Sequence, residues 1–210
     1  GSVGSLNMAD VGRLMSTLDN DQHKLAIAGG LLLFVVFGIK AAMLPVGFWL
    51  PKTYAVASTP VAAIFTIMTK VGIYAILRVN GTVFDDAMAQ SIFKNTLLLI
   101  GLITSIYGVI GAIGAERLRR FVGFMVLSSV GTLLIAIAMF NTQAWSAGLY
   151  YLVHSTLIAA AFYLFCGWIT AQRGMFKDHL KVAPKIKNEK AAALTYFLIA
   201  MMMAGLPPFS

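Results

Sequence analysis

The chain has 210 residues, of which 59% are hydrophobic and only 11% are charged. Its formal net charge is +8 and its mean hydropathy is +0.83. A water-soluble domain carries about 25% charged residues, so this composition excludes a water-soluble enzyme. Several stretches instead reach the roughly 18–20 apolar residues that cross a bilayer. The composition therefore predicts an all-α, polytopic membrane protein.

The helices can be placed along the chain from its apolar runs. Residues 1–24 are polar and mildly amphipathic, and we expect them to form a surface segment at the membrane face. The remainder, 25–210, is predicted to form a transmembrane bundle. Its expected spans, the last of them partial, cover about 25–44, 60–77, 95–115, 121–140, 144–172 and 191–206. Because the chain begins without Met and ends inside an apolar run, we interpret it as a fragment of a longer protein.

The third span contains no charge and carries small residues at helical spacing. They are Gly101, Ser105, Gly108 and Ala112. Such a stripe allows two membrane helices to approach closely. We therefore expect it to be a packing face.

Basic residues alternate with neutral or acidic loops, and this alternation predicts the orientation. The basic segments, which we expect to be loops, are 45–59, 116–120 and 173–190, whereas the loop at 80–94 is acidic and the turn at 141–146 is neutral. Short basic loops remain in the cytoplasm. We therefore expect the basic segments to be cytoplasmic and residues 1–24 to lie on the opposite side. The net charge then reflects loop bias and does not indicate a nucleic-acid site.

Two lysines lie inside the apolar runs. Lys40 follows the uncharged stretch from Leu25 to Ile39 and precedes the helix-breaking Pro45 by a few positions. Lys70 lies near the middle of the second span. A lysine at the centre of a membrane helix costs about 2.5–3.5 kcal/mol on insertion scales, so its presence indicates a function.

His154 lies on the fifth span, and with the two lysines it indicates proton or ion transfer. Burial favours the neutral form of an amine, so a lysine inside a membrane can bind and release a proton near neutral pH. An imidazole can pass a proton along. Helix breaks beside Pro45 and at Pro207-Pro208 would expose backbone dipoles and admit water, as transporter sites require.

Each of these residues also has a structural alternative. The Lys40 stem can extend to the membrane interface if its helix ends near Pro45. Lys70 is too central to reach either surface, but it can be purely structural, and His154 can be a core histidine bonded to a backbone carbonyl. The sequence contains no phosphate-binding loop, metal-ligand spacing or nucleophile–base set, and its one cysteine, Cys166, cannot form a disulfide framework. We therefore expect no catalytic site, no metal and no cofactor.

An ordered set of residues in the first two spans carries a family resemblance. The set is Lys40, Pro45, Trp49-Leu50-Pro51, Thr59-Pro60-Val61, Lys70, Gly72, Tyr74 and Arg78. It resembles the antiporter-type membrane subunits of Mrp-type multisubunit Na+/H+ antiporters and of respiratory complex I, and is closer to the D-type subunit of Mrp antiporters. The resemblance continues more loosely through Arg119-Arg120, 128–131, 151–167 and 205–210, and so covers essentially the whole chain.

The resemblance implies a fold of about fourteen helices built from inverted five-helix repeats with broken helices. This chain would then span helix seven to the first half of helix twelve. Lys40 would be the lysine of the broken helix, Lys70 the central lysine and His154 the relay on helix eleven. The acidic partner of Lys40 and the relay residue of helix twelve would lie outside this sequence.

The sequence departs from the family pattern between Lys70 and His154. Ser129 stands where some members have histidine, Ile158 replaces a lysine, and Met125 and Val126 replace serines. This region is therefore drier than in some relatives. Ordered water, or relay support from Ser128 and Ser129, would have to bridge the path.

The implied function is that of a subunit of a multisubunit monovalent cation/proton antiporter. Its Lys/His relay would move protons in exchange for Na+ or K+. The implied partners are other membrane subunits and the lipid bilayer of a bacterial cytoplasmic (inner) membrane, with no nucleic acid. One alternative is a proton-pumping subunit of complex I or a related redox complex. A second is a non-conducting structural subunit, in which Lys40 and Lys70 would be dispensable.

Overall fold

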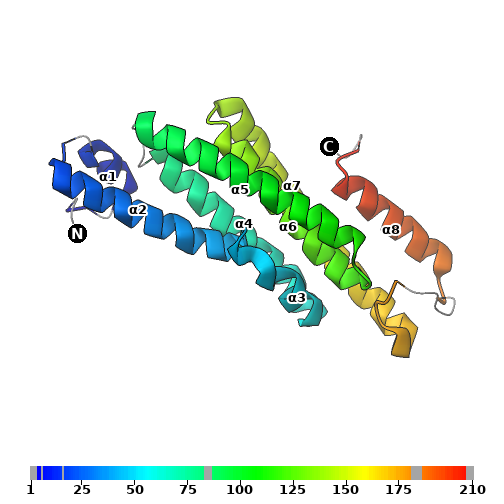
Figure 1. Ribbon diagram of the computed structural model, residues 1–210. Coiled ribbons are helices and arrows are strands. Elements are labelled where there is room, and N and C mark those ends of the chain that lie inside the picture. Colours follow the sequence, from blue (N-terminus) through cyan, green and yellow to red (C-terminus); the bar gives the residue numbers. More distant parts are fainter. Residues whose placement is uncertain (1–3, 6, 16, 83–86, 181–185, 207–210) are drawn as a thin grey trace.

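The computed structural model describes residues 4–5, 7–15, 17–82, 87–180 and 186–206. The described chain is built from helices and one isolated β-bridge. The helices are α1 (Met8–Met15), α2 (Asn20–Ala41), η1 (Val46–Phe48), α3 (Trp49–Val56), α4 (Thr59–Thr82), α5 (Ala87–Ile113), α6 (Leu118–Ala138), α7 (Thr142–Arg173), η2 (Gly174–Phe176) and α8 (Glu189–Met203). They form an elongated bundle (Figure 1). In the described residues, five segments are long and apolar enough to cross a membrane. The predicted all-α, polytopic fold is confirmed.

The N-terminal region contains a short helix that packs against the bundle. Met15 of α1 is buried and forms a small cluster with Val79 of α4 and Phe93 of α5. The following helix, α2, begins at Asn20, so the expected boundary at residue 24 falls inside it. Lys24 pairs with Asp21 on its exposed first turn, with 3.3 Å between Nζ and Oδ1.

The first span is broken directly after Lys40. The helix α2 ends at Ala41, and Ala42 takes a left-handed conformation with φ of 61°. The chain then continues through η1 into α3, so Asn20–Val56 forms one interrupted span. The predicted break near Pro45 is therefore present.

The prediction that 45–59 is a loop is wrong. Most of this segment is helical, and Leu50 and Tyr54 are buried in the main core. Its prolines are compatible with helix because Pro45 precedes η1 and Pro51 lies in the first turn of α3, where the missing N–H has no intrahelical acceptor.

The small-residue stripe of α5 packs against α6, as predicted. A Cβ atom added to Gly108 would lie 2.5 Å from Ser128 N, and one added to Gly131 would lie 2.5 Å from Ser105 N. Real side chains do not approach a neighbouring backbone so closely. The two helices are therefore in contact backbone to backbone along an extensive interface.

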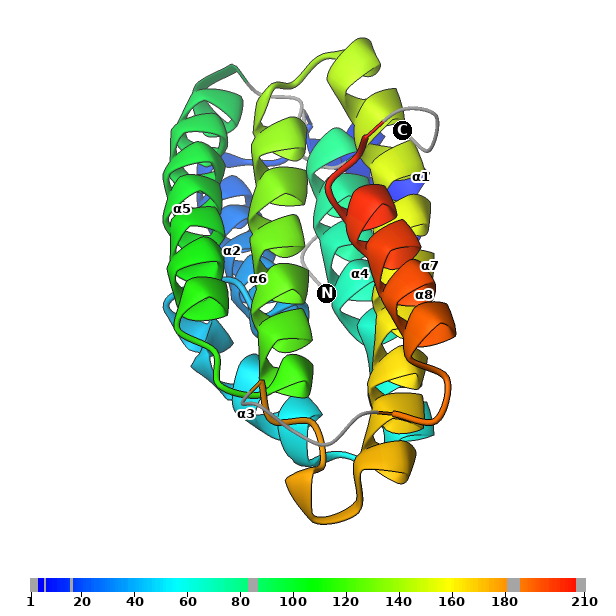
Figure 2. The same cartoon turned by 90° about the vertical axis from the view of Figure 1, so that its right-hand side faces the viewer.

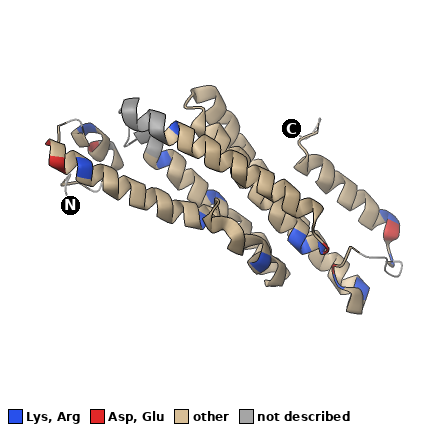
Figure 3. Ribbon diagram, viewed as in Figure 1, with Lys and Arg blue, Asp and Glu red and all other residues tan. Residues whose placement is uncertain are grey.

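The basic segments meet at one end of the bundle. Arg117 and His179 form an antiparallel β-bridge, and Leu118 N donates to Asp178 O at 2.8 Å. Figure 2 shows α3, the α5–α6 connection and η2 at the same end, and Figure 3 shows lysines and arginines there as well as along the bundle and at its opposite end. We use "basic end" for this end of the bundle.

Candidate functional site

Lys70 is buried at the meeting point of α4, α6 and α7. Only 1% of the residue is exposed. Its Nζ donates a hydrogen bond to Ser129 Oγ of α6, and Ser129 Oγ in turn donates to Val126 O at 2.7 Å. On its other side, Lys70 lines an apolar groove of about 250 Å³ between α4 and α7. The buried amine is therefore connected to α6 by a hydrogen bond within an otherwise apolar setting.

A cavity of about 140 Å³ links Ser129 to His154. We call it the His154 cavity. Its polar side chains are Ser128, Ser129, Tyr151, His154 and Ser155, and it is completed by Met125, Ile158, Met202 and Met203. A polar cavity of this volume can hold ordered water. The cavity thus borders both His154 and Ser129, the residue that contacts Lys70.

His154 is half-buried on α7 and its ring is stacked on Tyr150. The ring centroids are 6.0 Å apart and the planes are inclined by 15°. Since Tyr150 is one turn earlier on the same helix, the stacking restricts the ring plane while the imidazole borders the cavity. An imidazole in this place can accept a proton at one nitrogen and release one from the other.

The two candidate serines have different surroundings. Ser129 is buried and contacts Lys70, whereas Ser128 Oγ lies 3.4 Å from Ser105 Oγ of α5. Both border the His154 cavity. Ser129 is therefore the residue that connects the amine to the cavity.

Lys40 lies in the last turn of α2 and is exposed in the described structure. It has no acidic partner among the described residues. Its helix end nevertheless packs tightly against the lysine-bearing part of α4. A Cβ atom on Gly72 would lie 2.8 Å from Ala41 N and 3.0 Å from Phe37 O. The backbones beside Lys40 and Lys70 are thus in direct contact. Pro207 and Pro208, the second predicted break, lie outside the described residues.

Thr104 supports the break in the first span, and sequence reasoning missed it. Its Oγ1 accepts a hydrogen bond from Leu44 N at 3.1 Å and donates to Ile100 O at 2.6 Å, fully buried. The freed N–H of the broken helix is therefore satisfied by a side chain of α5. The available signal was a threonine near the middle of an uncharged, mostly apolar run.

Arg119 is a second residue whose role was missed. Its Nη1 donates to Ala57 O at 3.1 Å and its Nη2 donates to Thr59 Oγ1 at 2.6 Å, so it holds the corner between α3 and α4. Its backbone N donates to Asp178 Oδ2 at 3.2 Å. This buried carboxylate lies at the start of α6, where the helix dipole favours a negative charge. The sequence indicated only a basic turn.

Comparison with known proteins finds a matching family model and similar chains. The family model described as "NADH:quinone oxidoreductase/Mrp antiporter, TM" matches residues 2–210. The chain is 36% identical over 230 residues to the D-type subunit of a probable K(+)/H(+) antiporter from Rhizobium meliloti, covering 100% of this chain and 43% of the relative. It is 33% identical over 210 residues to the D-type subunit of a Na(+)/H(+) antiporter from Bacillus subtilis, covering 99% of this chain and 41% of the relative.

Solved structures show the same fold. A chain of the Mrp complex from Dietzia superposes with a TM-score of 0.81 at 32% identity, covering 99% of this chain and 37% of that chain. A chain of the archaeal membrane-bound sulfane sulfur reductase superposes with a TM-score of 0.83 at 21% identity, covering 99% of this chain and 42% of that chain. The chain thus spans about two fifths of the length of the proteins it matches.

Proposed function

The chain belongs to the NADH:quinone oxidoreductase/Mrp antiporter transmembrane family, and from this membership we propose that it is part of a subunit of a multisubunit monovalent cation/proton antiporter. The exchanged cation is Na+ or K+, the ions named for the relatives from Bacillus subtilis and Rhizobium meliloti. The observation that carries the proposal is the path from the buried Lys70 amine through Ser129 to the His154 cavity.

The proposed transfer runs along this path. A proton leaves Lys70 toward Ser129, crosses the cavity through its hydroxyl groups and ordered water, and reaches His154. Lys40 controls the step electrostatically from the neighbouring helix break, because like charges repel strongly in a low-dielectric interior. A cation or proton that arrives near Lys40 changes the charge around the Lys40 amine through an acidic partner outside this chain. From His154 the proton passes to a further residue that also lies outside this chain.

We place the basic end on the cytoplasmic side of a bacterial inner membrane, with residues 1–24 on the opposite side. The clustering of the basic segments at one end supports this orientation. The proposed partners are the other membrane subunits of a hetero-oligomeric antiporter complex. The similarity to a chain of the Mrp complex from Dietzia supports this assembly.

A proton-pumping subunit of a redox complex is the second candidate. It is favoured by the shared fold with the sulfane sulfur reductase chain, but that likeness is at 21% identity and concerns the fold alone. The relatives at 33–36% identity are named as antiporter subunits. A non-conducting structural subunit is the third candidate, and a buried lysine hydrogen-bonded beside a polar cavity argues against it.

The test is cation-dependent proton exchange in inverted vesicles that carry the full-length protein with its partner subunits. Lys70→Ala and His154→Ala are compared with Lys94→Ala, which removes an exposed amine near the start of α5. We expect the first two variants to lose most of the exchange at normal assembly, while Lys94→Ala retains it. Unchanged exchange in Lys70→Ala would leave the structural candidate standing. Exchange that requires an added electron donor would favour the redox-complex candidate.

A further inference from the structure

Two cavities lie one above the other in the crevice between α6, α7 and α8. The first is the His154 cavity. The second lies at the basic end, has a volume of about 340 Å³, and carries the charged side chains of Arg173, Asp178 and Glu189 on its wall. We call it the basic-end cavity. Each helix contributes to both, so the two cavities are separated along the helix axes rather than by a helix.

Each of the three helices places an apolar side chain between the two cavities. On α7 the cavity linings stop at Ile158 and resume at Phe165, with Phe162 between them. On α8, Ile199 lies between the linings from Tyr196 and Met202, and on α6, Phe121 lies between those from Leu118 and Met125. Phe121, Phe162 and Ile199 thus occupy one level of the crevice, which we call the apolar layer.

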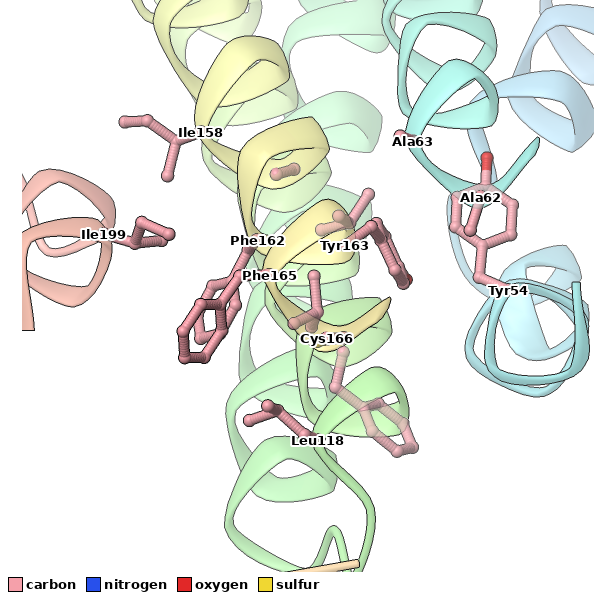
Figure 4. Close-up of a cluster of buried hydrophobic side chains, with 14 of the residues drawn as sticks. Tyr54, Ala62, Ala63, Leu118, Ile158, Phe162, Tyr163, Phe165, Cys166 and Ile199 are labelled. Atoms are coloured by element: carbon pink, nitrogen blue, oxygen red, sulfur yellow. The ribbon is translucent and has the colours of Figure 1, made fainter. Parts of the chain in front are cut away.

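The apolar layer is closely packed. Phe162 is 1% exposed, and its ring contacts Phe121 edge-on with centroids 6.0 Å apart. The ring of Tyr196 lies 5.8 Å from that of Phe162, also edge-on. Ile199 is 8% exposed and belongs to the same buried cluster. Figure 4 shows Ile199 of α8 opposite the α7 side chains Ile158, Phe162 and Phe165.

We propose that Phe121, Phe162 and Ile199 form a water-excluding layer that closes the His154 cavity toward the basic end. Its role in exchange rests on the proposed function: the layer determines which side of the membrane supplies protons to His154. A proton moves along hydrogen-bonded groups about 3 Å apart. Ile158 and Phe165 are seven positions apart, which is about 10 Å along the helix. This distance is too great for a direct transfer, and the side chains of Phe121, Phe162 and Ile199 offer no hydrogen-bonding group. Ser129, in contrast, both contacts Lys70 and lines the His154 cavity. The connection from Lys70 to this cavity therefore does not cross the layer.

Cysteine labelling tests the layer independently of transport. The full-length protein is prepared in its complex with its cysteines replaced, including Cys166→Ala. Ser155→Cys then reports on the His154 cavity and Ala193→Cys reports on the basic-end cavity. A small, charged methanethiosulfonate is added to the membrane face that carries the basic end, and modification is followed as a mass shift. We expect Ser155→Cys to react at least tenfold more slowly than Ala193→Cys.

Opening the layer should remove this difference. Phe162→Ala, or Ile199→Ala if the larger truncation prevents assembly, should raise the Ser155→Cys rate at least tenfold and leave the Ala193→Cys rate unchanged. Leu164→Ala, on the exposed face of α7, is the matched control and should change neither rate. Equal labelling rates of Ser155→Cys and Ala193→Cys in protein with an intact layer would overturn the proposal. An unchanged Ser155→Cys rate in both Phe162→Ala and Ile199→Ala would also overturn it. Because labelling needs no transport, the layer can be confirmed even if Lys70→Ala shows the exchange proposal to be wrong.

Discussion

Removal of the Ser129 hydroxyl is the sharpest test of the connection between the buried amine and the His154 cavity. Lys70 Nζ donates to Ser129 Oγ, which passes a hydrogen bond to Val126 O at 2.7 Å. Ser129→Ala deletes one oxygen atom and leaves the Lys70 amine, in a residue that is 1% exposed, without this acceptor. The substitution therefore changes the polar path and leaves the apolar packing of α6 intact.

The expected effect can be estimated from the hydrogen bond that is lost. A hydrogen bond to a charged group contributes about 1.5–3 kcal/mol. If it acts in the transfer step, its loss slows exchange by about 10–150-fold, since each 1.36 kcal/mol is tenfold in rate. Ser128→Ala is the matched control. Ser128 is the neighbouring residue of the same helix, and its substitution removes only a 3.4 Å contact with Ser105 Oγ of α5. Its effect should therefore stay below about threefold, less than 1 kcal/mol.

The assay is the initial rate of cation-dependent proton exchange in inverted vesicles, normalised to the amount of assembled complex. Ser129→Thr keeps a hydroxyl and should restore much of the rate. The reasoning is refuted if Ser129→Ala and Ser128→Ala exchange at equal rates. It is also refuted if Ser129→Thr is as slow as Ser129→Ala, because packing rather than the hydroxyl would then be responsible.

Two further predictions concern residues that hold the site in place, and both are measured as thermal unfolding of the intact complex. Arg119→Gln removes two hydrogen bonds from a guanidinium, each contributing about 1.5–3 kcal/mol, and should lower the midpoint clearly. Arg120→Gln loses a cation–π contact of about 0.5–1 kcal/mol and should change it little. Thr104→Val leaves the buried Leu44 N–H without its acceptor, at a cost of about 1–3 kcal/mol, whereas Thr132→Val, on an exposed position, should be nearly neutral. Equal midpoints within either pair would contradict the role given to Arg119 or Thr104.

Apolar run length predicted the helices well, because a bilayer requires long apolar segments whatever their neighbours are. The fourth span, expected at 121–140, is α6 at Leu118–Ala138. The error at 45–59 arose from reading its prolines as helix breakers. A proline ends a helix only where an N–H bond to the preceding turn is required, and Pro51 lies in the first turn of α3, where none is.

The sequence predicted which residues belong to the candidate site, but not how they contact one another. A lysine far from both helix ends must be buried, and Lys70 is. The choice between Ser128 and Ser129 could not be made from sequence, because consecutive residues of a helix point about 100° apart and the rotation of α6 is set by its neighbours. The partners of Arg119 were inaccessible for a similar reason. They lie 59 to 62 residues away along the chain, in segments that only tertiary packing brings together.

One helix, α6, carries both the connection to Lys70 and part of the apolar layer. Ser129 and Phe121 lie eight residues apart on it, about 12 Å along the axis. The helix is fixed to α5 by backbone contact at Gly108 and Gly131, so it cannot slide without separating that pair. If the proposed layer opens by movement of helices, we therefore expect α7 or α8 to be displaced relative to α6. Such a displacement widens the crevice around the His154 cavity and leaves the α6 backbone that carries Ser129 fixed to α5. In the proposed exchange, access to His154 then changes sides while the Lys70 contact is kept, which is the separation that directional proton transfer requires.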